Sequence, residues 1–198
     1  MANRLAHLIS IAVLAVAMAG CTTAPSRFYT LDSTATADAS APPTRYYAVM
    51  VGPVYVPASV DRPEFVVQLQ PNRVEIDEFN RWAAPLGDSI ARAIAGDLAV
   101  QLGTPDVAVG PLVNFRPAYR VSINVQRFES VPGQSVLVDA MWTVHQTAGS
   151  EERSGRTVSR EPVQGNGFDA LAAAHSRALA TVSADIAAAI RASTAAGR

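Results

Sequence analysis

The stretch YRVSINVQRF, from Tyr119 to Phe128, decides how this chain folds. Apolar and polar side chains alternate along it, so that one face holds Tyr119, Val121, Ile123 and Val125 and the other holds Arg120, Ser122, Asn124 and Gln126. Because successive side chains of a strand lie on opposite faces of a sheet, the pattern predicts a strand with one face against a core and the other in water.

This strand is the first of three in a row. The turn VPGQS leads into residues 135–146, where one face holds only apolar side chains: Val136, Val138, Ala140, Trp142 and Val144. After the polar break TAGSEERS, residues 155–163 predict a third strand with weaker patterning. Consecutive strands with short connections usually pair with one another, so the three are expected to form an antiparallel meander.

Two helices complete the pattern. The first is expected over residues 85–102, since Pro85 suits a first helical turn and Gly103 suits the stop. Its apolar residues recur every four positions: Leu86, Ile90, Ile94, Leu98 and Leu102. The second is expected over residues 168–191, with apolar positions Phe168, Leu171, Leu179, Val182, Ile186 and Ile190. Such stripes are typical of helices that cover a sheet.

Shorter strands precede the first helix. Residues 46–56 read as a strand broken near Gly52 and Pro53, and residues 64–70 and 73–76 read as two short strands at a sheet edge or in a hairpin. Strands interrupted by one helix, then a meander and a closing helix, predict an α+β fold. We expect a two-layer domain, with a mixed, mostly antiparallel sheet and two amphipathic helices on one face.

The N-terminus predicts an export signal over residues 1–20. A single charge, Arg4, is followed by the apolar run from Leu8 to Ala19, which is shorter than the about 20 residues that a membrane-spanning helix needs. Cys21, the only cysteine of the chain, follows directly. The alternative is an ordinary secreted protein with a stray cysteine.

The residues before Cys21 resemble the lipobox of bacterial lipoproteins. That resemblance implies cleavage after Gly20, a diacylglycerol on the cysteine sulfur and a third acyl chain on the new amino group. Two membrane signals already give stable anchoring, so three acyl chains should hold the chain permanently on a leaflet.

The rest of the chain divides into three parts. Residues 21–44 are expected to be a lipidated N-terminus, with a short strand at RFYTL and a flexible loop over residues 33–44, which lack large apolar side chains. Residues 45–192 should form the α+β domain, and residues 193–198 a disordered tail.

Charge and cysteine content exclude several classes of protein. Without Arg4, 15 basic residues stand against 17 acidic ones, so the net charge is −2. The sequence has no stripe of basic residues, so its charge gives no reason to expect a nucleic-acid partner. One cysteine can form neither a disulfide within the chain nor a cysteine-based metal site.

Catalytic and metal motifs are weak. GDSI, residues 87–90, is similar to the motif of GDS-type serine hydrolases, but Ser89 falls inside a helix, and Asp169 and His175 are six residues apart where that family has three. His145 and His175 lack the spacing of metal ligands. We therefore predict no catalytic residue, no metal and no cofactor.

Two further stretches, DRPEFV and FNRWAAPL, have structural explanations residue by residue. Asp61 can fix a loop through hydrogen bonds, and Pro63 restricts Arg62 to extended conformations. Trp82 is placed to cover the core just ahead of the helix that Pro85 begins.

Taken together, these motifs resemble one family. The lipobox, RFYTL, VGPVYVPASVDRPEFV, NRWAAPL before an amphipathic helix, and Phe128 with a tryptophan in the next strand match, in order and spacing, the PqiC/YmbA family of ABC-type transport auxiliary lipoproteins. The resemblance covers nearly the whole mature chain. It assigns to structure or partner binding the residues Tyr29, Leu31, Pro57, Asp61, Arg62, Pro63, Trp82, Pro85 and Leu86.

The resemblance implies a non-catalytic lipoprotein on the periplasmic face of the outer membrane of a Gram-negative bacterium. Its implied partners are an MCE-domain protein and an ABC permease and ATPase that move lipid between membranes, and a homo-oligomeric ring is allowed. Thr22 after the cysteine fits outer-membrane sorting. Two alternatives stay open: a lipid carrier with its own acyl-chain cavity between helices and sheet, and a GDS-type envelope esterase.

Overall fold

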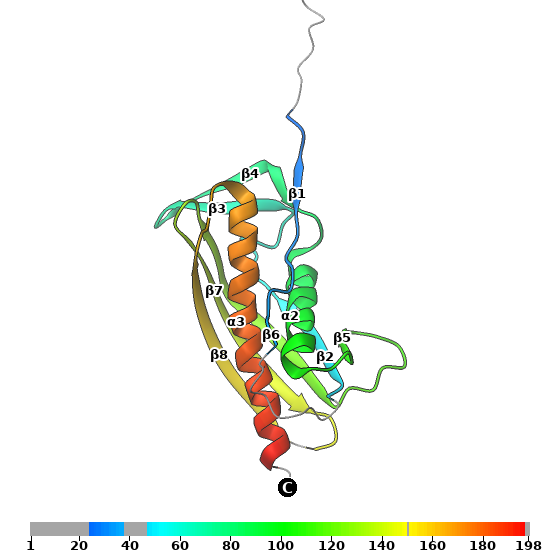
Figure 1. Ribbon diagram of the computed structural model, residues 1–198. Coiled ribbons are helices and arrows are strands. Elements are labelled where there is room, and N and C mark those ends of the chain that lie inside the picture. Colours follow the sequence, from blue (N-terminus) through cyan, green and yellow to red (C-terminus); the bar gives the residue numbers. More distant parts are fainter. Residues whose placement is uncertain (1–23, 38–46, 150, 197–198) are drawn as a thin grey trace, which may run out of the picture.

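The computed structural model describes residues 24–37, 47–149 and 151–196. The expected signal peptide over residues 1–20, the expected lipidation site Cys21 and the end of the expected loop after Ala37 lie outside these residues. Two helices and two mixed sheets make up the described part, so the predicted α+β fold is confirmed (Figure 1).

The larger sheet, called here the main sheet, has five strands in the order β5-β2-β6-β7-β8. The predicted meander is confirmed: β6 (Tyr119–Val131), β7 (Ser135–Gln146) and β8 (Glu152–Pro162) pair antiparallel. The expected inward face of β6 is buried, with Val121, Ile123 and Val125 at most 2% exposed.

Two parallel strands complete the main sheet. The strand β2 (Val49–Tyr55) lies between β6 and β5 (Val107–Val109) and is parallel to both. Its register shifts between Val51 and Val54, which is the break that Gly52 and Pro53 predicted. The three-residue β5 was not predicted, because so short an apolar run has no readable period.

A second sheet, called here the cap sheet, has three strands in the order β1-β4-β3. The strand β4 (Arg73–Trp82) pairs antiparallel with β3 (Glu64–Gln70) and parallel with β1 (Arg27–Tyr29). The expectation of a single sheet was therefore wrong in this respect. The pairing of β1 with β4 joins segments about fifty residues apart, and sequence periodicity carries no information on such long-range partners.

Both helices cover one face of the main sheet, as predicted (Figure 1). The helix α2 (Leu86–Leu102) contacts β2 and β5, and α3 (Gly167–Ala196) contacts β7 and β8. All five residues of the predicted stripe on α2 are buried, and Gly103 ends this helix in the left-handed conformation. The α2 cap thus follows the usual preference for glycine after the last turn.

The end of α3 differs from the prediction. The helix continues past Arg191 to Ala196, so residues 193–196 are helical where a disordered tail was expected. Ser193 is buried, and its hydroxyl donates a hydrogen bond to the Ala189 carbonyl oxygen at 3.2 Å. The serine bonds to its own helix, so its polarity did not mark a helix end.

Candidate functional site

The family-signature residues gather where the cap sheet meets the main sheet. Trp82, at the end of β4, is 5% exposed and stacks on Phe65 of β3 with ring centroids 4.3 Å apart. Tyr29 of β1 meets the same Phe65 edge to face at 5.9 Å. Two rings from outside the cap sheet join this cluster: Phe168 of α3 contacts Phe65, and Phe128 of β6 contacts Trp82. This aromatic junction holds the two sheets together, since such ring pairs add stability beyond their burial.

Burial also affects the chemistry of Tyr29. Its ring is 9% exposed, and its hydroxyl donates a hydrogen bond to Asn80 Oδ1 at 2.6 Å. Burial, with the negative charge of Asp169, raises the pKa of Tyr29 above its usual value. Tyr29 is therefore a neutral hydrogen-bond donor within the junction.

The loop from Pro57 to Pro63 is tied to this junction through its backbone. The carbonyl oxygen of Pro57 accepts hydrogen bonds from the amides of Val60 and Asp61, both at 3.0 Å. The Trp82 amide donates to the Pro63 carbonyl oxygen at 2.7 Å, and the Ala83 amide donates to the Tyr29 carbonyl oxygen at 2.9 Å. The stretches DRPEFV and FNRWAAPL, about twenty residues apart in the sequence, are thus neighbours in space.

The nine signature residues divide by exposure. Tyr29, Leu31, Trp82 and Leu86 are buried and belong to the core. Asp61, Pro63 and Pro85 are exposed, and Pro57 and Arg62 are half-buried. Arg62 Nε is buried with no hydrogen-bond partner in the described part of the chain. The first group packs in the core, and the second group lies at or near the surface.

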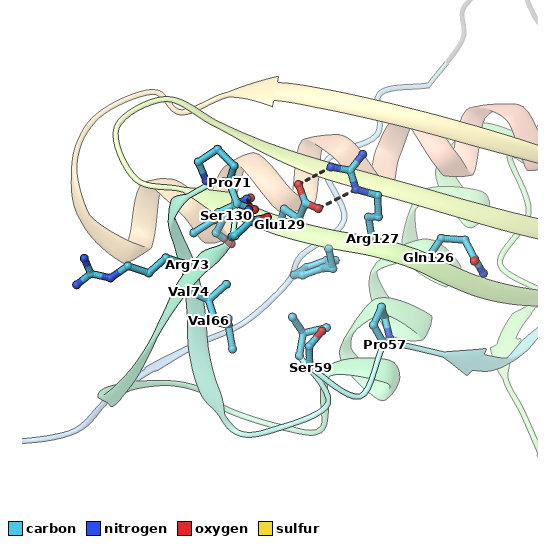
Figure 2. A pocket seen from close by; sticks show the side chains of 14 residues that line it. Pro57, Ser59, Val66, Pro71, Arg73, Val74, Gln126, Arg127, Glu129 and Ser130 are labelled. Carbon is cyan, nitrogen blue, oxygen red and sulfur yellow. Dashed lines mark hydrogen bonds and ion pairs between the residues drawn. The ribbon is translucent and has the colours of Figure 1, made fainter.

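Beside the junction, a groove of about 300 Å³ separates the cap sheet from β6 (Figure 2). Val66 and Val74 line it from the hairpin, and Pro57 and Ser59 line it from the loop. On β6, Arg127 and Glu129 form an ion pair at 2.7 Å, which Figure 2 shows as dashed lines. The groove therefore offers apolar contact and a neutralised charge pair to anything that enters it.

The segment after β1 is bound to α2 through Asp97. This carboxylate is fully buried, and its Oδ1 accepts hydrogen bonds from the Ser33 hydroxyl at 2.8 Å and from the amides of Thr34 and Ala35, both at 2.9 Å. Its Oδ2 accepts one from the Ser183 hydroxyl of α3 at 3.1 Å. We call this arrangement the Asp97 clamp. The expected flexible loop is wrong for residues 33–35, because a buried carboxylate replaces the apolar anchors that the segment lacks.

A glycine allows this segment to approach α2. A Cβ added at Gly96 would lie 2.8 Å from the Cβ of Ser33, closer than side-chain atoms pack. The glycine thus leaves room for the chain that the Asp97 clamp holds.

His175 of α3 is completely buried. Its ring stacks on Phe128 with centroids 3.8 Å apart, and its Nε2 shares a hydrogen bond with the Ser130 hydroxyl at 2.8 Å. Burial lowers the pKa of His175 from 6.5 to about 3, so the imidazole is neutral at physiological pH. Nδ1 has no partner among the described residues, so no carboxylate completes a catalytic triad there.

The esterase motif does not assemble either. Ser89 is buried inside α2, and its hydroxyl accepts a hydrogen bond from Arg92 Nη2 at 3.3 Å. His175 instead pairs with Ser130. Within the described ranges, no group of three metal-ligating side chains occurs. Neither α2 nor α3 is both long and apolar enough to cross a membrane.

Comparison with known proteins identifies the class of this protein. The family model described as "ABC-type transport auxiliary lipoprotein component" matches residues 29–187, from the aromatic junction almost to the end of α3. The chain belongs to this family. Membership makes it an auxiliary lipoprotein of an ABC-type transport system in the Gram-negative cell envelope. It also gives the class of an auxiliary transport component.

Solved structures support the fold. A protein of the DUF330 family from Xanthomonas campestris is 20% identical, with a TM-score of 0.66 over 82% of this chain and 93% of its own. An uncharacterized protein is also 20% identical, with a TM-score of 0.66 over 84% of this chain and 99% of its own. No curated protein sequence matches the chain.

Sequence reasoning missed the Asp97 clamp and the pair of Ser130 and His175. A charged residue on the apolar side of α2, one position before the stripe residue Leu98, was a usable signal for the first. The pair carried no local signal, since its members lie 45 residues apart on different elements.

Proposed function

We propose that this protein is a non-catalytic docking component of an MCE-type system that moves lipid between the two membranes. In this proposal, acyl chains on Cys21 hold it on the periplasmic face of the outer membrane. The cap end of the domain then stays near the leaflet, and exposed signature residues receive the MCE-domain protein or its ABC partners.

The observation that carries the proposal is the connection between the N-terminus and the core. Only a few residues separate Cys21 from Ala24, where the described chain begins, and β1 follows at Arg27. The segment after β1 is then held by the Asp97 clamp. A domain attached in this way stays close to its anchor and has a restricted orientation, which suits docking better than long-range capture.

Docking also agrees with the energetics of lipid movement. Exposing an acyl chain to water costs about 0.8 kcal/mol of free energy per CH₂ group. A lipid that moves between membranes therefore needs a continuous apolar path through protein. A docking protein fixed to the acceptor leaflet keeps the outer end of this path near the membrane. Its effective concentration there is high even if each contact is weak. The proposal includes a homo-oligomeric ring of this protein around that end.

The carrier alternative lacks a supporting observation. The space between the helices and the main sheet is filled by side chains with no more than 1% exposure, such as Ile94, Ile123 and Leu179. Native mass spectrometry of the domain after incubation with membrane extract checks this point. A stoichiometric phospholipid on the monomer would contradict the purely docking role.

Lipidation is tested by metabolic labelling with a palmitate analogue. We expect label in the wild type and none in Cys21→Ser, together with a mass increase from three acyl chains on the mature wild-type protein. Membrane fractionation of the same cells assigns the leaflet, and recovery with the inner membrane would overturn the outer-membrane placement.

Docking is tested by photocrosslinking in intact cells. A photoreactive amino acid at Asp61, which is exposed in the signature loop, should capture an MCE-domain or ABC component. The same group at Met141, exposed on the outer face of the main sheet, is the matched control. Equal capture from both positions, or capture of neither component, would count against the signature surface as the docking site.

A further inference from the structure

The outer face of the cap sheet carries exposed apolar side chains. Phe28 is 64% exposed, Val74 60% and Ile76 43%. Register relates their directions through β3: Phe28 lies across from Arg81, Arg81 lies across from Glu64, and Glu64 precedes Phe65, which points into the core. We call Phe28, Val74 and Ile76 the outer apolar face.

Pairing within the hairpin confirms the direction of the two aliphatic residues. Ile76 lies across from Val66, and Val74 lies across from Gln68. The alternate residues of β3, Phe65 and Val67, are at most 4% exposed and point into the core. Because neighbours along a strand point in opposite directions, Val74 and Ile76 point away from the core. Val74 also borders the groove beside β6, but it keeps 60% of its surface exposed.

Charge on this face does not favour anionic lipid. Arg81 and Glu64, cross-strand partners beside Phe28, form an ion pair at 2.7 Å. Elsewhere on the cap sheet, the exposed cations Arg27 and Arg73 stand against the exposed acids Glu75 and Glu78, so the sheet has no excess of positive charge. Attraction to a negative surface is therefore excluded as the main force, and the apolar side chains fit the acyl region of a zwitterionic leaflet.

The position of the chain's N-terminus points to the same surface. Phe28 lies seven residues after Cys21, and an extended chain spans at most about 3.6 Å per residue, so at most about 25 Å separates them. In Figure 1 the described chain begins at the end where β1, β3 and β4 lie, while the C-terminal end of α3 lies at the opposite end. An anchor on Cys21 therefore brings the cap sheet, rather than the far end of the helices, to the membrane.

We propose that the outer apolar face, Phe28, Val74 and Ile76, inserts into the leaflet that holds the acyl chains of Cys21. The inference rests on the lipidation in the proposed function. Three partly exposed side chains bind weakly alone, but attachment through the acyl chains makes their insertion an intramolecular step. The contact fixes which end of the domain faces the membrane and leaves the far end of α3 directed toward the periplasm.

The test uses a chemical anchor in place of the natural one. Mature protein, residues 21–198, is coupled through its single thiol to a maleimide phospholipid in phosphatidylcholine vesicles with brominated acyl chains, which quench tryptophan on contact. The test variants are Phe28→Trp and Val74→Trp. The matched controls are Val113→Trp, in the loop after β5, and Val158→Trp, on the outer face of the main sheet, because both side chains are also exposed, at 85% and 57%.

We expect quenching several-fold greater at positions 28 and 74 than at 113 and 158, after subtraction of the signal from Trp82 and Trp142. Equal quenching at all four positions, or none at 28 and 74, would overturn the proposal. If 28 and 74 are instead protected from aqueous acrylamide without being quenched by lipid, a second copy covers the face and the proposal fails.

The two proposals fail separately. The chemical anchor works whether or not cells acylate Cys21, so quenching reports on the face alone. Loss of palmitate labelling would remove the natural anchor, while the quenching result would still stand.

Discussion

The two sheets of this protein differ in what their outer faces present to the surroundings. On the outer face of the main sheet, the exposed apolar residues Met141 and Val158 lie near a charge pair: Arg156 donates two hydrogen bonds to Asp139, at 2.9 and 2.7 Å, and lowers the pKa of that carboxyl. The outer face of the cap sheet presents Phe28, Val74 and Ile76. A face that includes a charge pair and a face that we propose to contact lipid thus lie on one small domain, and the N-terminal strand β1 belongs to the second.

The largest expected effect concerns the connection between the two sheets. Trp82→Ala removes the ring that stacks on Phe65 and should lower the free energy of unfolding by about 4 kcal/mol. Trp142→Ala, the matched change in the main sheet, should cost about 2 kcal/mol, because that half-buried ring leaves a smaller void. Urea denaturation followed by circular dichroism measures both. Equal losses would mean that Trp82 in the aromatic junction contributes no more to stability than Trp142 in the main sheet.

The Asp97 clamp is expected to come next. Asp97→Ala leaves the Ser33 hydroxyl and the amides of Thr34 and Ala35 without their acceptor, and we expect a loss of about 3 kcal/mol. Limited proteolysis should then cut within residues 24–37. Asp88→Ala, in the exposed first turn of the same helix, is the control and should leave this segment protected. Unchanged protection in Asp97→Ala would show that β1 alone holds the segment.

A smaller effect depends on pH. The folded state keeps His175 neutral down to about pH 3, whereas an unfolded imidazole takes up a proton near pH 6.5. The unfolded state therefore binds more protons in this window, and stability should fall with decreasing pH, by about 2 kcal/mol between pH 6.5 and pH 5. Below about pH 3 this contribution levels off.

The variant His175→Phe isolates the histidine's share. It keeps a ring against Phe128 and should remove the slope between pH 6.5 and 5, although it lowers stability overall because Ser130 loses its partner. Denaturation midpoints across pH measure the difference, and a wild-type slope in His175→Phe would refute the assignment.

The smallest effect is expected at the groove's edge. Glu129→Gln breaks the pair with Arg127, whose side chain is 51% exposed, and should change stability by no more than about 0.5 kcal/mol. Thermal unfolding at low and at high salt measures it. A loss of several kcal/mol would show that this pair helps to hold the cap sheet against β6.

The same contrast explains what the sequence predicted. On β6 and β7, apolar residues face the helices and mostly polar residues face water, so alternation revealed the strands and their meander. The hairpin of the cap sheet has apolar residues on both faces, Phe65 and Val67 inside and Val74 and Ile76 outside. Alternation there was weak, and neither the separate sheet nor its place on the body could be predicted.

The candidate site shows a similar division. The local motifs that led to the family also identified Trp82 and Leu86 as structural, since a proline, a large ring and a helical stripe leave local signals. The partners of Asp97 and the pairing of Ser130 with His175 depend on contacts between residues 45 to 86 positions apart. These contacts depend on tertiary packing, so single-sequence reasoning could not reach them.

The parallel pairing of β1 with β4 has a mechanical consequence. Three consecutive residues of β1 lie in register with Asn80, Arg81 and Trp82, and the segment that follows is held by Asp97. A force from the membrane on the N-terminus acts along β1, roughly across its hydrogen bonds, so these bonds bear the load together instead of opening one at a time. The load then passes into α2, inside the core, and the tether should resist extraction better than its three-residue strand suggests.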